Sequence, residues 1–136
     1  MENSKEVLDE ATAAKCFAVA WNRLDSSVIE PLLSDDVIYE SQHVLVPIVG
    51  RKKFIDYLQG KMDTVKKGGD DSKVFADIGL VMNNKPCVIM AQRTKSNLLA
   101  TVLFDIDNNL IKRIDMCGVA PRPSEAKRYE EYPEEL

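Results

Sequence analysis

Several residue types that build common functional sites are scarce in this chain of 136 residues. It contains one histidine, His43, one tryptophan, Trp21, and three cysteines. Cys16, Cys87 and Cys117 lie far apart, so the chain lacks the CxxC spacing of a redox pair and the paired spacing of a structural metal site. We therefore expect three reduced, buried thiols and no metal site.

Excess basic charge and cofactor-binding motifs are missing as well. The chain has 18 lysines and arginines against 22 aspartates and glutamates, which gives a net charge of -4. A protein that binds nucleic acid needs clustered Lys and Arg, and the best basic run, Arg51 to Lys53, is interpreted as the solvated first turn of a helix. There is no GxGxxG sequence and no phosphate loop. We expect no nucleic-acid partner and no cofactor.

Long apolar runs are absent too. The first residues read Met-Glu-Asn-Ser-Lys-Glu and contain no apolar leader, and no stretch approaches the roughly 20 apolar residues that cross a bilayer. We expect no membrane partner and a cytoplasmic location.

The composition that remains is that of a globular domain, with 45% hydrophobic and 29% charged residues. We expect one α+β domain over residues 1–120. A charged, proline-containing tail over residues 121–136 is then either mobile or a strap across the domain.

Three helices are predicted from apolar periodicity and capping residues. The first begins after a cap at Asn3 or Ser4. Its apolar face is formed by Val7, Ala11, Ala14, Phe17, Trp21 and Leu24. Ser27 and Glu30 have the spacing of a capping box and predict a short second helix, which Pro31 limits.

The third helix is predicted from Arg51 to the pair Gly68-Gly69. Its apolar face is formed by Phe54, Leu58, Met62 and Val65. The segment before it, from His43 to Val49, carries Pro47 and predicts an irregular loop or an edge strand.

Strands are predicted where the pattern alternates every two residues. The first covers Val37 to Ser41. The later ones are Lys73 to Met82, Pro86 to Thr94, Leu98 to Ile106 and Leu110 to Gly118. Short, asparagine-rich connections between them favour successive hairpins, so we expect an antiparallel meander. If the turn at Ser96-Asn97 has two residues, Arg93 lies opposite Ala100.

The order of these elements resembles a known superfamily. The most specific pieces are the run Leu-Leu-Ser-Asp-Asp-Val-Ile-Tyr-Glu over residues 32–40 and Gly50-Arg51 at the start of the third helix. From Val7 to Gly118 the chain is similar to the nuclear transport factor two-like superfamily, including its SnoaL-like polyketide cyclase and ketosteroid isomerase-like branches.

The resemblance implies a cystatin-like cone. In this fold a curved antiparallel sheet wraps around a long N-terminal helix, two further helices complete the cone, and a cavity remains at the open end. Members frequently form homodimers through their sheets. The same scaffold carries isomerases, dehydratases, cyclases, hydrolases and proteins without chemistry, so the fold alone assigns no function.

The residues that ketosteroid isomerases use are replaced here. By ungapped matching, the helix tyrosine falls at Phe17, the proton-transferring aspartate at Ser41 and the late-strand acid at Val102. None of these side chains does the required chemistry, so a standard ketosteroid isomerase is not expected.

Three other residues are candidate catalytic groups. His43 shares a face with Tyr39 and Ser41 if the strand continues, and it then acts as a general base; the alternative is an exposed or hydrogen-bonded loop histidine. Arg93 is a candidate for binding a carboxylate or an enolate-like oxygen, with Asp115 as its partner or as a base. The alternative for this pair is an ion pair between strands or between subunits.

The first function hypothesis is a pocket protein of unknown activity that binds a small, mostly apolar or weakly acidic molecule. The side chains expected at the ligand are Phe17, Trp21, Tyr39, Ser41, Val102 and Met116. Taken one at a time, Trp21, Tyr39 and Met116 are more simply explained as core.

Two alternatives stay open. One is a cofactor-independent SnoaL-like lyase or isomerase that uses His43 as its base, with Tyr39 or Arg93 stabilising the oxygen charge. The other is a dimeric interaction module that pairs through an apolar sheet face. That face is predicted to contain Val88, Met90, Leu99, Thr101 and Leu103.

Overall fold

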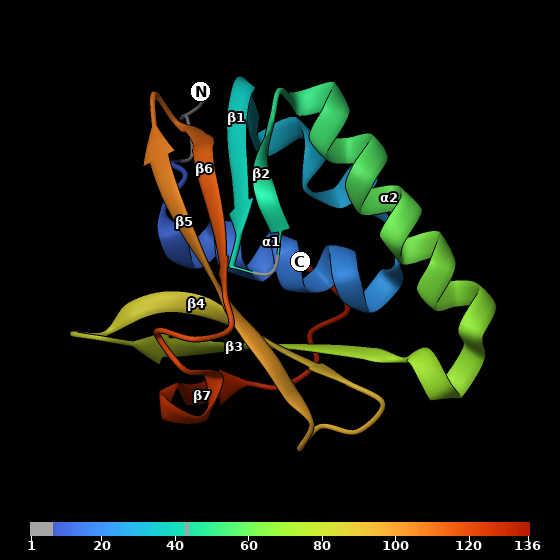
Figure 1. Ribbon diagram of the computed structural model, residues 1–136. Coiled ribbons are helices and arrows are strands. Elements are labelled where there is room, and N and C mark those ends of the chain that lie inside the picture. Colours follow the sequence, from blue (N-terminus) through green and yellow to red (C-terminus); the bar gives the residue numbers. More distant parts are fainter. Residues whose placement is uncertain (1–6, 43) are drawn as a thin grey trace.

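A curved, seven-stranded sheet packs against two α-helices in the computed structural model (Figure 1). The structure describes residues 7–42 and 44–136. Its helices and 3-10 turns are α1 (Glu10–Arg23), η1 (Ser26–Val28), η2 (Glu30–Leu32), α2 (Arg51–Gly68), η3 (Gly69–Ser72) and η4 (Pro123–Glu125). Its strands are β1 (Leu33–Ser41), β2 (Val44–Val49), β3 (Val74–Val81), β4 (Lys85–Gln92), β5 (Leu98–Asp107), β6 (Leu110–Cys117) and β7 (Lys127–Glu130).

The sheet has the strand order β2-β1-β6-β5-β4-β3-β7. Helix α1 packs on β3, β4 and β5, and α2 packs on β1 and β2 (Figure 1). The expected α+β class, the curved sheet around the first helix and the meander from β3 to β6 are confirmed. The pairing of β1 with β6 is parallel, so the sheet is mixed and the expectation of a purely antiparallel sheet is corrected.

Helix α1 begins later than the sequence pattern indicates. Asp9 caps it by accepting a hydrogen bond from the Thr12 backbone N–H at 2.7 Å, whereas the predicted caps Asn3 and Ser4 lie outside the described residues. Val7 therefore precedes the helix and is 80% exposed. The helix ends at Leu24, whose left-handed backbone lets its N–H bond to Ala20 and Trp21 carbonyls.

The predicted second helix is a pair of 3-10 turns, η1 and η2. Its cap is Asp25, which accepts from the Ser27 backbone N–H at 3.0 Å, and not Ser27 itself. Pro31 lies in η2 and limits the helix as expected. Helix α2 has the predicted bounds, and Phe54, Leu58 and Met62 are buried. The segment with Pro47 forms the edge strand β2.

The connection from β4 to β5 is longer than the predicted two-residue turn. Met90 lies opposite Ala100, whereas the expected register placed Arg93 there. The difference is three residues, and an odd shift moves a strand's side chains to the other face of the sheet. Val88 and Met90 consequently pack into the main core, while Leu103 packs on the opposite face with Cys87 and Ile89. The five residues predicted as one dimerisation face do not share a face.

The C-terminal segment lies across the domain as a strap. Strand β7 pairs with β3, and a Cβ at Gly79 would come within 2.7 Å of the Lys127 carbonyl oxygen, so this close approach requires glycine. Asp77, 3% exposed, accepts hydrogen bonds from Arg128 Nε at 2.5 Å and from the Tyr132 backbone N–H at 2.8 Å. No helix among residues 7–42 and 44–136 is long and apolar enough to cross a membrane.

Asn22 joins α1, β3 and the strap. Its Nδ2 donates to the carbonyl oxygens of Ala76 at 2.8 Å and Pro133 at 2.7 Å, and its Oδ1 accepts from the Ala76 backbone N–H at 2.9 Å. Asn22 is 9% exposed, so water does not easily replace these bonds.

The substitution Asn22→Ala is expected to lower the free energy of unfolding by about 2–4 kcal/mol, because it leaves buried backbone groups of β3 and the strap without partners. Urea denaturation measures this. The matched control is Glu131→Ala, whose exposed ion pair with Lys95 at 3.1 Å predicts a loss below about 1 kcal/mol. Equal losses in the two variants would contradict the role given to Asn22.

Candidate functional site

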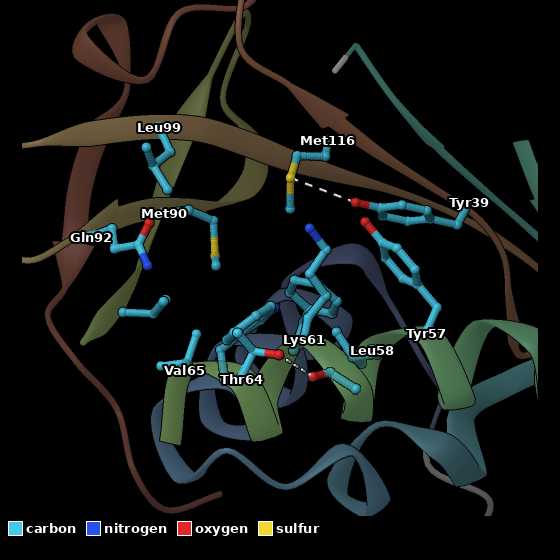
Figure 2. A pocket seen from close by; sticks show the side chains of 14 residues that line it. Tyr39, Tyr57, Leu58, Lys61, Thr64, Val65, Met90, Gln92, Leu99 and Met116 are labelled. Atoms are coloured by element: carbon cyan, nitrogen blue, oxygen red, sulfur yellow. Dashed lines mark hydrogen bonds between the residues drawn. The ribbon is translucent and has the colours of Figure 1, made fainter. Parts of the chain in front are cut away.

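A cavity of about 550 Å³ lies between α2 and the sheet, with α1 at its base (Figure 2). Its walls are mainly apolar and aromatic, with a few polar groups. The lining residues that carry the argument below are Trp21, Tyr39, Tyr57, Lys61, Met90 and Met116. The cavity exists because α2 crosses the open side of the curved sheet at a distance that the side chains between them do not fill.

Two tyrosines and a methionine form one end of the cavity. The rings of Tyr39 on β1 and Tyr57 on α2 lie 5.5 Å apart between centroids, and Tyr39 Oη donates to Met116 Sδ at 3.6 Å (Figure 2). Burial raises the pKa of the Tyr39 phenol, and the neighbouring Tyr57 raises it further. Tyr39 is therefore a neutral hydrogen-bond donor at ordinary pH and not a general base.

Trp21 contributes the wall from α1. Its side chain is 7% exposed, and Phe17 beside it packs edge-on against Phe104 with centroids 5.4 Å apart. Among the described residues, Trp21 Nε1 is the single buried side-chain nitrogen or oxygen without a hydrogen-bond partner. An unpaired buried donor costs about 1–3 kcal/mol, and such costs concentrate at functional sites.

One charged side chain, Lys61, belongs to the described lining. It follows Tyr57 by one helical turn, and its Nζ lies 5.5 Å from the centroid of the Tyr57 ring. Figure 2 shows Lys61 extending from α2 into the cavity on the side of Tyr57 and Met116. The other polar lining groups are Thr64 on α2 and Gln92 at the end of β4.

The structure places four of the six predicted ligand-binding residues in the lining. Phe17, Trp21, Tyr39 and Met116 line the cavity. Val102 is fully buried in the core and does not line it. Ser41 borders a separate hollow of about 300 Å³ together with Asp115, and its side chain also hydrogen-bonds to Tyr39 of the main cavity.

Two of the three predicted catalytic residues, Arg93 and Asp115, are described by the structure, and neither lines the cavity. His43 lies outside the described residues. Arg93 is exposed in the β4–β5 connection with φ 71°, and its backbone N–H donates to the Lys73 carbonyl at 2.7 Å. Asp115 accepts from Arg113 Nε at 3.1 Å.

Asp115 belongs to an ion-pair network on the outer sheet face. Arg113 also pairs with Glu40, and these contacts, that with Glu40 first, raise the pKa of the Arg113 guanidinium. Asp115 and Arg113 lie on the same strand, β6, and the contact of Arg113 with Glu40 is the one that joins two neighbouring strands. Asp115 is thus held in an ion pair, but with Arg113 and not with the predicted partner Arg93. No cluster of three His, Cys, Asp or Glu residues suited to a metal ion occurs in the described part of the chain.

Sequence reasoning missed Tyr57, Lys61 and Thr64. A signal was present, because positions 57, 61 and 64 recur at four- and three-residue steps and form a row beside the apolar face of α2. Apolar periodicity does not predict this row, because its residues are polar or half-buried.

Comparisons with solved structures identify the fold. A SnoaL-like protein of unknown function from Burkholderia thailandensis superposes with a TM-score of 0.60 at 15% identity, over 82% of this chain and 97% of that one. An NTF2-like protein of unknown function from Cytophaga hutchinsonii gives 0.57 at 11% identity, over 83% and 92% of the chains. A protein with a ketosteroid isomerase-like fold from Catenulispora acidiphila gives 0.54 at 11%, over 79% and 85%.

These likenesses concern the fold. The sequence matches no protein-family model and no curated protein. The chain thus has the fold of the nuclear transport factor two-like superfamily, as its sequence pattern indicates.

The raised pKa of Tyr39 has a consequence at alkaline pH. The unfolded chain releases this proton near pH 10 while the folded protein still holds it, so the stabilising contribution is present below about pH 10 and is lost as the pH rises towards the folded value. We expect Tyr39→Phe to lose stability less steeply than the wild type above pH 10 in urea denaturation. Equal slopes would contradict the assignment.

Proposed function

We propose that the protein binds a small, mostly apolar molecule in the cavity between α1, α2 and the sheet. The observation that carries this proposal is the cavity itself. Its volume of about 550 Å³ falls within the range of about 300–1,000 Å³ that is typical of small-molecule sites. An ordinary core of this size is filled by side chains, because each unfilled space loses dispersion contacts.

The chemistry of the walls supports an apolar ligand. Phe17, Trp21, Met90 and Met116 present aromatic and thioether surfaces to the cavity. Removing apolar surface from water gains about 25 cal/mol per Å², and methionine side chains adapt to ligands of different shape. A molecule with a ring system or a branched chain meets these requirements.

A few polar groups are placed to orient the ligand. Tyr39 and Tyr57 offer hydroxyl groups at one end, and Gln92 offers its amide oxygen at the other, since its Nε2 already donates to the Ser72 carbonyl at 3.1 Å. An apolar cavity with a few polar groups is typical of small-molecule sites, and the tyrosine with the raised pKa is a poor base.

The enzymatic alternative, a cofactor-independent lyase or isomerase with His43 as its base, remains a prediction because His43 lies outside the described residues. Arg93 is exposed and Asp115 is held by Arg113, so neither adds support to it. A homodimer and a cytoplasmic location also remain predictions. The outer face near Cys87 and Ile89 is partly covered by Ala126 of the chain's own strap.

The binding proposal is tested by filling the cavity. Thr64 lines it from α2, so Thr64→Trp places an indole inside, whereas Lys53→Trp adds the same side chain at an exposed position of α2 outside the lining. We expect the neutral probe N-phenyl-1-naphthylamine to bind the wild type and Lys53→Trp with saturable fluorescence. Thr64→Trp should weaken this binding at least about tenfold, which corresponds to about 1.4 kcal/mol.

Circular dichroism is measured on both variants as the control for folding. Absence of saturable binding to the wild type, or equal binding by Thr64→Trp, would argue against a ligand site in this cavity.

A further inference from the structure

The position of Lys61 makes the cavity chemically asymmetric. Its ammonium group is the one charge among the described lining residues, and it lies beside the tyrosine end (Figure 2). The Tyr57 ring faces it at 5.5 Å from the centroid, a distance at which a cation is attracted to the ring but keeps its hydrogen-bonding hydrogens free.

Lys61 has no carboxylate partner among the residues that the structure describes. Lys53, Lys66 and Lys67 on the same helix have no carboxylate partner among these residues either, so the missing ion pair alone does not distinguish Lys61. Lys61 differs from them because it belongs to the cavity lining. A ligand in the cavity therefore reaches an ammonium group for which no carboxylate of the described chain competes.

Desolvation decides which ligand fits. Lys61 lines the cavity but is exposed, so a neutral apolar molecule there removes part of the water around its ammonium group and replaces none of the lost hydrogen bonds. An anionic group offsets this cost by forming a charge-assisted hydrogen bond, and such bonds are about twice as strong as neutral ones. The Tyr57 hydroxyl faces the same region and supplies a further donor, whereas the Tyr39 hydroxyl already donates to Met116 Sδ (Figure 2).

We infer that the ligand is a small amphipathic monocarboxylic acid whose carboxylate pairs with Lys61 and whose apolar body lies against Trp21 and Met90. The inference rests on the proposed binding function and names its ligand class. One ammonium balances one carboxylate, whereas a phosphate monoester carries about -1.5 to -2 charges and would leave part of its charge unpaired. Lys61, which lines the cavity, and not Arg93, which lies outside the lining, is then the residue that selects an acid.

The experiment compares two probes of nearly equal shape, 2-naphthoate and 2-naphthamide, by isothermal titration calorimetry at pH 7.5. Only the first carries a charge. The variants are Lys61→Met, which keeps the length of the side chain and removes the charge, and Lys53→Met, which makes the same change at an exposed position of α2 outside the lining. Lys53→Met controls for the altered net charge.

We expect the wild type and Lys53→Met to bind 2-naphthoate about tenfold or more tightly than 2-naphthamide. Lys61→Met should lose this preference by weakening naphthoate binding, with naphthamide affinity changed by less than about twofold. Unchanged naphthoate binding in Lys61→Met, an equal loss of both probes, or no naphthoate binding by a wild type that binds N-phenyl-1-naphthylamine would each overturn the acid class and leave the binding function standing. If the wild type binds none of the three probes, the binding function itself fails.

Discussion

The arrangement of the whole domain depends on how the side chain of Asn22 is satisfied. Its side-chain amide hydrogen-bonds to the N–H and the carbonyl of Ala76 on β3 and to the Pro133 carbonyl of the strap. These bonds connect α1 to the sheet and to the C-terminal strap. Trp21 is the preceding residue on α1. The hydrogen bonds of Asn22 set the rotation and the axial position of α1 relative to β3. They therefore also set the position of the Trp21 side chain in the cavity wall. The functional site and the stability of the fold meet at adjacent residues.

Much of this architecture follows from local sequence patterns. Helix α2 and strands β3 to β6 are predicted to within a few residues because alternation and helical periodicity reflect the burial of one face. The faces of β4 and β5 are not predicted, because they depend on the length of one connection: Asn97 bonds back to Gln92 and closes a longer loop than the assumed two-residue turn. The local sequence pattern indicates which segments form strands. The pairing register of two strands depends in addition on the length and conformation of the connection between them.

The candidate site shows the same division. Phe17, Trp21, Tyr39 and Met116 line the cavity because they belong to elements whose buried faces are evident, and the superfamily resemblance places those faces around a cavity. Their contact with a ligand stays a prediction. Val102 is assigned to the wrong place because packing against α1 closes the sheet there. Hydrophobic periodicity does not identify Lys61, because a charged residue on an exposed row of a helix resembles any solvated lysine. Its position at the cavity depends on the angle at which α2 crosses the sheet.

The apolar wall and the polar end of the cavity differ in how much their residues contribute to the core. The apolar wall comes from α1 and the central strands, where residues such as Phe17 and Met90 are buried in the main core and large changes are costly. The row at Tyr57, Lys61 and Thr64 lies beside the core face of α2 that Phe54 and Met62 anchor. Substitutions along that row change the charge and size of the polar end without opening the core. In this chain one set of residues maintains the fold, and another carries the ligand selection proposed above. Such a separation lets one scaffold accommodate unrelated ligands.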